Sequence, residues 1–308
     1  MAKRRKRRNS GKKSLGAVLA VVLVVVINML WNGSFSQLME EKNYERTGNE
    51  EELEVHFIDV GQGDATLILQ GEHAMLIDAG ENRCGDQIVD YMNYLGVEHL
   101  DYVIGTHPDS DHIGGLDTVL RNSTWDTVLM PDYEKDTRTY EEVLEVLDRE
   151  GKESVAPKPG DVYSLGTAQF TVLAPIGKYE SGNENSIAIR LVHGGNSFLF
   201  TGDAESESES DMLTSGRLLA SDVYKVSHHG SSGANTELFL LAVNPEYAVI
   251  SCGVDNEYGH PHSEVLNRLR AMGTKVFRTD EQGTIVATSD GSEVSFNMSP
   301  SETWQSGR

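Results

Sequence analysis

The stretch THPDSDHIGG, residues 106–115, places two histidines and two aspartates within six residues and then continues into two glycines. Imidazole nitrogens and carboxylate oxygens are the donors with which proteins bind divalent transition metals. An aspartate often caps a helix N-terminus, but a cap accounts for one of these four donors and not for all of them. The stretch therefore predicts a metal site with the ligands His107, Asp109, Asp111 and His112.

Two further polar clusters follow apolar runs that are typical of strands. FLFTGD ends at Asp203, and KVSHHGSS, residues 225–232, contains His228 and His229. Because functional groups of layered α/β proteins gather at one edge of the sheets, we expect these residues to join the first cluster. Asp203 is then a candidate to bridge two ions. Side chains alternate along a strand, so we expect one histidine of the pair to face the site, with a preference for His229.

Three other segments contain candidates for contact with a substrate. NEYGHPH, residues 256–262, contains Tyr258, a candidate substrate-binding residue. It also contains His260 and His262, either of which could protonate a leaving group. The alternative interpretation of this segment is a surface turn. NENS, residues 183–186, presents Asn185, for which a plain turn is an equal alternative. Asp64 ends the tight loop DVGQGD and is a structural residue first and a substrate-binding candidate second.

Strand-like and helix-like stretches alternate from residue 51 to residue 297. LEVHFIDV, residues 53–60, has the alternation of a strand, and DQIVDYMNYLG, residues 86–96, repeats its apolar residues at helical spacing before a terminal glycine. The second half of the chain repeats this rhythm. The pattern predicts an α/β fold with two mixed sheets packed face to face and helices outside, followed by a tail at 298–308.

The segment before this domain has the pattern of a membrane anchor. Residues 14–31, SLGAVLAVVLVVVINMLW, contain no charge and are long enough to span a bilayer. The basic residues 1–13 should then stay in the cytoplasm, which places the domain outside the cell behind a stalk at 32–50. The alternative is a cleaved signal peptide and a secreted protein, but the apolar run is long and lacks a small-residue cleavage site.

The charge distribution bears on the substrate. Residues 1–13 hold eight of the 26 Lys and Arg and no acid, which leaves 18 basic against 48 acidic side chains and a net charge of −30 for the rest. A domain this acidic repels polyanions, except where bound cations reverse the local sign. Two cysteines, Cys84 and Cys252, are too few for a disulfide framework.

The motifs HFIDVGQGDATLI, LIDAG, THPDSDHIGG, FTGD, VSHHGS and YGHPH, taken together, resemble the metallo-β-lactamase superfamily. Within it they are most similar to the C-terminal hydrolase domain of ComEC competence proteins, and extracellular phosphorylcholine esterases share the same motifs. The resemblance implies a four-layer αββα sandwich that binds two divalent cations, Zn²⁺ or Mn²⁺. Many members have His at the position of Asp109, and an oxygen-rich site tilts affinity toward Mn²⁺.

The function that the resemblance implies is metal-dependent hydrolysis, with Asp111 among the catalytic residues and a bridging water as the nucleophile. The expected partners are the membrane and a phosphodiester, with DNA among the candidates; the sequence indicates no protein partner. The alternatives are a phosphodiesterase for cell-wall or small phosphodiesters, a non-catalytic metal-binding module and, as a weaker possibility, a β-lactamase.

Overall fold

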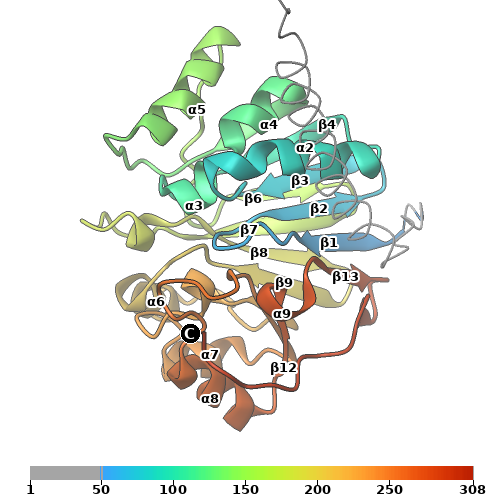
Figure 1. The fold of residues 1–308 in the computed structure, drawn as a ribbon, viewed down its shortest axis with the longest axis vertical. Coiled ribbons are helices and arrows are strands. Elements are labelled where there is room, and N and C mark those ends of the chain that lie inside the picture. Colours follow the sequence, from blue (N-terminus) through green and yellow to red (C-terminus); the bar gives the residue numbers. More distant parts are fainter. Residues whose placement is uncertain (1–48, 50, 308) are drawn as a thin grey trace, which may run out of the picture. The chain divides into compact units, whose positions relative to one another are not determined.

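Two mixed sheets of seven strands pack face to face in the computed structural model, which describes residues 49 and 51–307 (Figure 1). The first sheet has the order β14 (Val294–Phe296), β13 (Ile285–Ser289), β1 (Leu53–Phe57), β2 (Thr66–Gln70), β3 (His73–Ile77), β4 (His99–Ile104) and β5 (Thr124–Leu129). The second has the order β12 (Lys275–Arg278), β11 (Tyr247–Ile250), β10 (Val223–Lys225), β9 (Asn196–Phe200), β8 (Ala188–His193), β7 (Ala168–Ala174) and β6 (Val162–Leu165).

Helices cover the outer face of each sheet, so the unit has four layers (Figure 1). The first sheet is covered by α2 (Gly85–Tyr94), α3 (Ser110–Ile113), α4 (Leu116–Asn122) and α5 (Arg138–Arg149). The second is covered by α6 (Ser206–Thr214), α7 (Glu237–Val243) and α8 (Ser263–Met272). Short helical turns lie at η1 (Asn82–Cys84), η2 (Asn183–Asn185), η3 (Ser227–Gly230) and α9 (Thr279–Gln282).

The main core lies between the sheets, where Phe57 and Phe200 stack at 6.2 Å between ring centroids. All five residues of β1 are buried, although the sequence pattern predicts alternation between two faces. The reason is that both faces of the sheet are covered. On the outer face, His56 is buried, and its Nδ1 lies 2.8 Å from the hydroxyl of Tyr91 on α2.

The predicted arrangement of two mixed sheets with helices outside is confirmed. Helix α6, rich in serine and glutamate, has no counterpart in the sequence predictions. The predicted tail packs against the domain: the amide of Ser301 donates to Val276, and that of Gly307 donates to Pro261. The predicted anchor at 14–31 and its flanking segments lie outside the described residues. Among the described residues, no helix is long and apolar enough to cross a membrane.

Candidate metal centre

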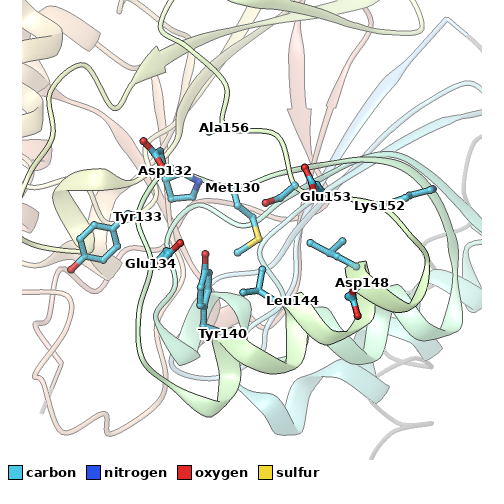
Figure 2. Close-up of a pocket in the computed structure, with 13 residues that line it drawn as sticks. Met130, Asp132, Tyr133, Glu134, Tyr140, Leu144, Asp148, Lys152, Glu153 and Ala156 are labelled. Carbon is cyan, nitrogen blue, oxygen red and sulfur yellow. The ribbon is translucent and has the colours of Figure 1, made fainter.

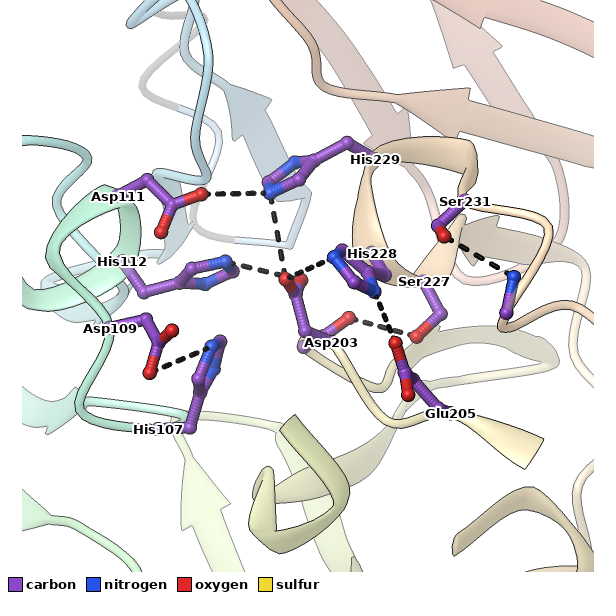
Figure 3. Close-up of polar contacts among 12 residues, drawn as sticks. His107, Asp109, Asp111, His112, Asp203, Glu205, Ser227, His228, His229 and Ser231 are labelled. Atoms are coloured by element: carbon purple, nitrogen blue, oxygen red, sulfur yellow. Dashed lines mark hydrogen bonds and ion pairs between the residues drawn. The ribbon is translucent and has the colours of Figure 1, made fainter. Parts of the chain in front are cut away.

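The segments that follow three strands meet at one point between the two halves of the domain (Figure 3). Neighbouring β9 and β10 are parallel, so their carboxyl ends open at the same edge of the second sheet. The segment after β4 reaches this edge from the first sheet. Together these segments supply His107, Asp109, Asp111, His112, Asp203, His228 and His229. The structure therefore brings together all seven predicted ligands; their roles as ligands remain predictions.

The turn after β4 carries the predicted ligands Asp109, Asp111 and His112 on a crowded backbone. Asp109 is the N-cap of α3, so Asp111 and His112 lie in the first turn of that helix. The side chain of Asp109 makes no capping hydrogen bond and is therefore free for another contact. A Cβ on Gly114 would lie 2.3 Å from the Asn82 nitrogen, closer than real side chains approach.

The rings of His112 and His229 are both anchored through Nδ1. His112 Nδ1 lies 2.8 Å from a carboxylate oxygen of Asp78, and His229 Nδ1–H donates to the Ser251 carbonyl over 3.0 Å. A carbonyl only accepts, so the proton of a neutral His229 sits on Nδ1. This arrangement fixes the tautomer and leaves Nε2 available to a ligand, as is usual for metal-binding histidines.

Buried atoms at the centre that make no hydrogen bond of regular geometry include the Nε2 atoms of His107, His112 and His229 and Oδ1 of Asp203, whose nearest polar neighbours are one another and Asp111. The four side chains are at most 4% exposed. Buried polar atoms without partners are costly, and native structures leave few of them. Nitrogen and carboxylate donors that converge without partners match the preferences of a divalent transition metal, so these residues fit such an ion.

The donor atoms at the centre form four overlapping groups, and two of these contain Asp64, which is paired with Lys225. Donors of His107, His112 and Asp203 all lie within 4.8 Å of one another, and so do those of Asp111, His112 and His229. Asp203 lies between these last two groups, with Oδ1 3.1 Å from His112 Nε2 and Oδ2 3.7 Å from His229 Nε2. This arrangement suits two neighbouring cations with Asp203 as the carboxylate between them.

The electrostatics of the centre favour cations. Burial would raise the pKa of Asp203, but the charges of His112 and His229 outweigh burial and hold that pKa well below its usual range. For His229, burial is outweighed by Asp203 and Asp64, which raise its pKa to about 10. Burial and the neighbouring His112 lower the pKa of His107 to about 4. The histidine protons therefore offset the carboxylates in the metal-free protein, and cations would displace them.

Asp109 lies at the edge of the centre, with its carboxylate toward His107 (Figure 3). Its Oδ1 accepts a hydrogen bond from the Lys135 ammonium over 2.7 Å, while His107 Nε2 lies 3.9 Å from the same oxygen. Asp109 and His228 are the two predicted ligands that the structure leaves outside the donor groups. Lys135 has no counterpart in the sequence predictions, because it lies in a loop separated from the motif by 26 residues.

Asp64 is buried beside the centre, in a donor group with Asp203 and His229. Its Oδ2 accepts from the Lys225 ammonium over 2.7 Å, and its Oδ1 lies 3.2 Å from His229 Nδ1. Its amide also donates to the Asp111 carbonyl. These contacts fit the structural role predicted first for Asp64, because its amide and its carboxylate link the segments that carry Asp111 and His229.

Both histidines of the HHG pair face Asp203, contrary to the expectation that only one would. His228 and His229 have φ angles of 48° and 53°, so the segment is a left-handed turn and not a strand. His228 Nε2 lies 3.6 Å from Asp203 Oδ2, and its Nδ1 lies 3.0 Å from Glu205 Oε1. The turn is held by Ser227, whose hydroxyl donates to the Gly202 and Ala204 carbonyls.

The NEYGHPH loop brings His260, but not His262, against the centre. The His260 ring lies 5.4 Å from the His228 ring, and burial, His229 and His228 lower its pKa to about 3. The Nδ1 of His262 accepts from the Ser232 amide, which leaves Nε2–H facing the Tyr258 carbonyl at 3.2 Å. His262 therefore stabilises the loop. Tyr258 is 60% exposed and stacks on His260.

Asn185 is occupied by its own loop. Its amide group donates to the carbonyls of Tyr179 and Ser181 over 2.8 and 2.7 Å. The neighbouring Ser186 reaches the centre instead, with its hydroxyl 3.4 Å from His107 Nδ1 and accepting from the Asp203 amide. The contacts favour the turn interpretation of Asn185 over substrate binding.

A separate hollow of about 390 Å³ lies between α5 and the segments on either side of it (Figure 2). Its lining includes Tyr133, Tyr140, Leu144, Lys152 and Glu153, and none of the predicted ligands. The hollow is therefore distinct from the metal centre, although the loop between β5 and α5 contributes to both.

The fold and the donor groups define a class: an αββα protein whose sheet edge carries candidate donors for divalent cations. The model of the metallo-β-lactamase superfamily matches residues 58–254, so the chain belongs to that superfamily. Its members are generally metal-dependent hydrolases.

The chain is 33% identical over 253 residues to ComE operon protein 3 of Bacillus subtilis, and 33% identical over 239 residues to competence protein ComA of Neisseria gonorrhoeae. The alignments cover 76% and 77% of this chain but only about a third of each relative. They confirm the similarity to ComEC-like competence proteins that the motifs indicated.

Solved structures support the fold alone. The metallo-β-lactamase fold protein YhfI of Bacillus subtilis superposes with a TM-score of 0.52 at 15% identity, over 76% of this chain and 98% of YhfI. CmlA, a diiron β-hydroxylase from Streptomyces venezuelae, superposes with a TM-score of 0.51 at 15% identity, over 73% of this chain and 52% of CmlA.

Proposed function

We propose that this chain is a metal-dependent phosphodiesterase. The observation that carries the proposal is the convergence of buried donors on His107, His112, His229 and Asp203, which belong to overlapping donor groups and make no hydrogen bond of regular geometry. When bound, two divalent cations would activate a water as the nucleophile and offset the charge of a phosphoryl group in the transition state. Zn²⁺ and Mn²⁺ both suit this donor set.

The chain's own residues contribute orientation and proton placement. Asp111, His112 and His229 would hold one cation, and His107 would hold the other, with Asp203 between them. Asp78 and the Ser251 carbonyl keep the rings of His112 and His229 turned so that Nε2 faces the centre.

The protonation of nearby histidines bears on the leaving group. Burial keeps His260 neutral at physiological pH. The Nδ1 atom of His228 lies 3.0 Å from Glu205, and its side chain is 21% exposed. His228 is thus better placed than the internally bonded His262 to donate a proton to a leaving oxygen.

Two classes of substrate fit this centre. The similarity to competence proteins favours nucleic acid, whereas the net charge of −30 outside residues 1–13 favours a small or cell-wall phosphodiester. A salt titration of DNA binding separates them, because a nuclease that contacts many phosphates loses affinity steeply with salt. A shallow slope together with turnover of small diesters would favour the second class.

We also propose that the chain is anchored in the membrane by residues 14–31, with the domain outside the cell. The support is the uncharged apolar run behind a basic segment. Protease treatment of intact cells should remove the domain from a membrane-bound protein. Protection in intact cells would contradict an outside location, and release into the medium would indicate signal cleavage.

The test of the activity is hydrolysis of bis-p-nitrophenyl phosphate by the full-length protein, stripped of metal and reloaded with Mn²⁺ or Zn²⁺. Asp203→Asn should abolish turnover, and the matched Asp126→Asn, at an exposed acid on β5, should not. Two bound equivalents of metal without turnover would contradict the phosphodiesterase and favour a non-catalytic metal-binding module or another ester. A β-lactam assayed alongside would test the weakest alternative.

A further inference from the structure

Lys135 occupies an unusual position beside the metal centre. Its ammonium lies 2.7 Å from Asp109 Oδ1, and both side chains are about one third exposed. The same oxygen of Asp109 lies 3.9 Å from His107 Nε2, an unpartnered atom of the centre. One carboxylate oxygen therefore stands between a lysine and a metal donor.

The surroundings of Asp109 leave its carboxylate little choice of direction. Gly182 of the loop before β8 packs so closely that a Cβ there would lie 3.2 Å from Asp109 Oδ1 and 3.4 Å from the Tyr133 ring. The Tyr133 hydroxyl in turn donates to the Glu180 carbonyl, which joins the two loops. Oδ1 of Asp109 is therefore held between Lys135 and His107 by close packing.

We propose that Lys135 competes with a cation for Asp109, and that the ammonium released by this competition binds an anionic oxygen of the substrate. A cation held by His107 and Asp203 would draw Oδ1 of Asp109 as a further ligand at the expense of its hydrogen bond to Lys135. The Lys135 ammonium, which is partly exposed, then loses its hydrogen-bond acceptor beside the centre. The substrate contact rests on the proposed function, whereas the competition does not.

Other basic side chains near the centre are less suited to this role. Lys225 is buried and paired with Asp64 on the far side of His229. Lys178 is 87% exposed and pairs with Asp132. The domain carries a large excess of negative charge, which disfavours the binding of an anion over most of its surface. A free lysine ammonium beside the bound cations would be the most favourable place for an anionic oxygen to bind.

The competition makes the two cation sites unequal. The group of Asp111, His112 and His229 has no lysine among the contacts of its donors, so it should bind the first equivalent. The group of His107 and Asp203 should bind the second equivalent more weakly, because a positive charge beside it repels the incoming ion.

The test is a calorimetric titration of the metal-free full-length protein with Mn²⁺, in the wild type and in Lys135→Met. We expect the weaker site to tighten about tenfold in Lys135→Met, the size expected when one screened like charge is removed. The tighter site should stay within about twofold. Lys135→Arg, which keeps the charge, should resemble the wild type, and the matched control Lys178→Met should change neither affinity.

The second readout is the kinetics of bis-p-nitrophenyl phosphate hydrolysis at saturating metal. KM should rise about fivefold in Lys135→Met with kcat nearly unchanged, because the lost contact binds substrate and transition state alike. Unchanged or weakened metal binding in Lys135→Met would overturn the competition. A tightened site with an unchanged KM would overturn the substrate contact alone. An absence of turnover in every protein would refute the proposed function, while the titration would still decide the competition.

Discussion

Replacement of the buried Lys225 by Met should cost about 3–5 kcal/mol of the free energy of unfolding. Its ammonium is 4% exposed and lies 2.7 Å from Asp64 Oδ2, which is itself buried. Burial raises the pKa of Asp64, but Lys225 and His229 outweigh it and lower that pKa to about 2. Without Lys225 a buried carboxylate loses its main counter-charge, and removal of one partner of such a pair typically costs this amount.

The assay is urea denaturation of the metal-free protein, with an exposed ion pair as the matched control. Lys275 and Glu246 lie at 2.9 Å with about half of each side chain exposed, so Lys275→Met should cost less than about 1 kcal/mol. The double variant Lys225→Met with Asp64→Leu should regain most of the stability, because both charges leave together. A loss below about 1 kcal/mol in Lys225→Met, or no recovery in the double variant, would refute this reasoning.

Three further predictions concern the centre itself. Asp78→Asn should weaken metal binding about 10- to 100-fold in a calorimetric titration with little loss of fold, since it weakens the anchor of His112; unchanged affinity would contradict it. The metal-free protein should lose stability as the pH rises from about 6.5 to about 10, because the raised pKa of His229 stabilises the folded state only while the ring is protonated; a metal-loaded sample should lack this loss in thermal melts, and equal losses would contradict the assignment. Gly63→Ala should unfold or displace the centre, because a Cβ there would lie 2.4 Å from the Asp111 carbonyl; a wild-type melting temperature would disprove the required close approach.

The donor cluster and the positions of many strands along the chain could be predicted because their signals are local in the sequence. Four of the six residues from His107 to His112 carry donor atoms. Apolar runs mark the strands that precede Asp203 and the HHG pair. The sequence cannot show the left-handed turn at His228 and His229, which depends on contacts with the Gly202 and Ala204 carbonyls from another segment. The strand assumption therefore failed at that turn.

The residues that orient the centre were harder to find because their partners are distant in the sequence. Lys225 and Asp64 are separated by 161 residues, and the helix α6 that carries buried Glu209 looks like a solvent-exposed acidic stretch. Glu209 is buried because it accepts the amides of Asn235 and Thr236 at the start of α7. The local sequence around a polar side chain thus does not indicate that the side chain accepts hydrogen bonds from backbone amides of a distant segment.

The balance of charge at the centre reconciles an acidic domain with an anionic substrate. Four carboxylates surround the donors, those of Asp64, Asp78, Asp111 and Asp203, and Lys225 offsets one of them. Protons on His112 and His229 offset two more in the metal-free protein. Without those two protons, the four carboxylates and Lys225 leave a net charge of −3. Two divalent cations would therefore give the centre a net charge of +1. The loaded centre would then attract an anion at short range, although the surrounding domain repels polyanions at longer range. This difference in range favours a diester whose charge is confined to the reacting group.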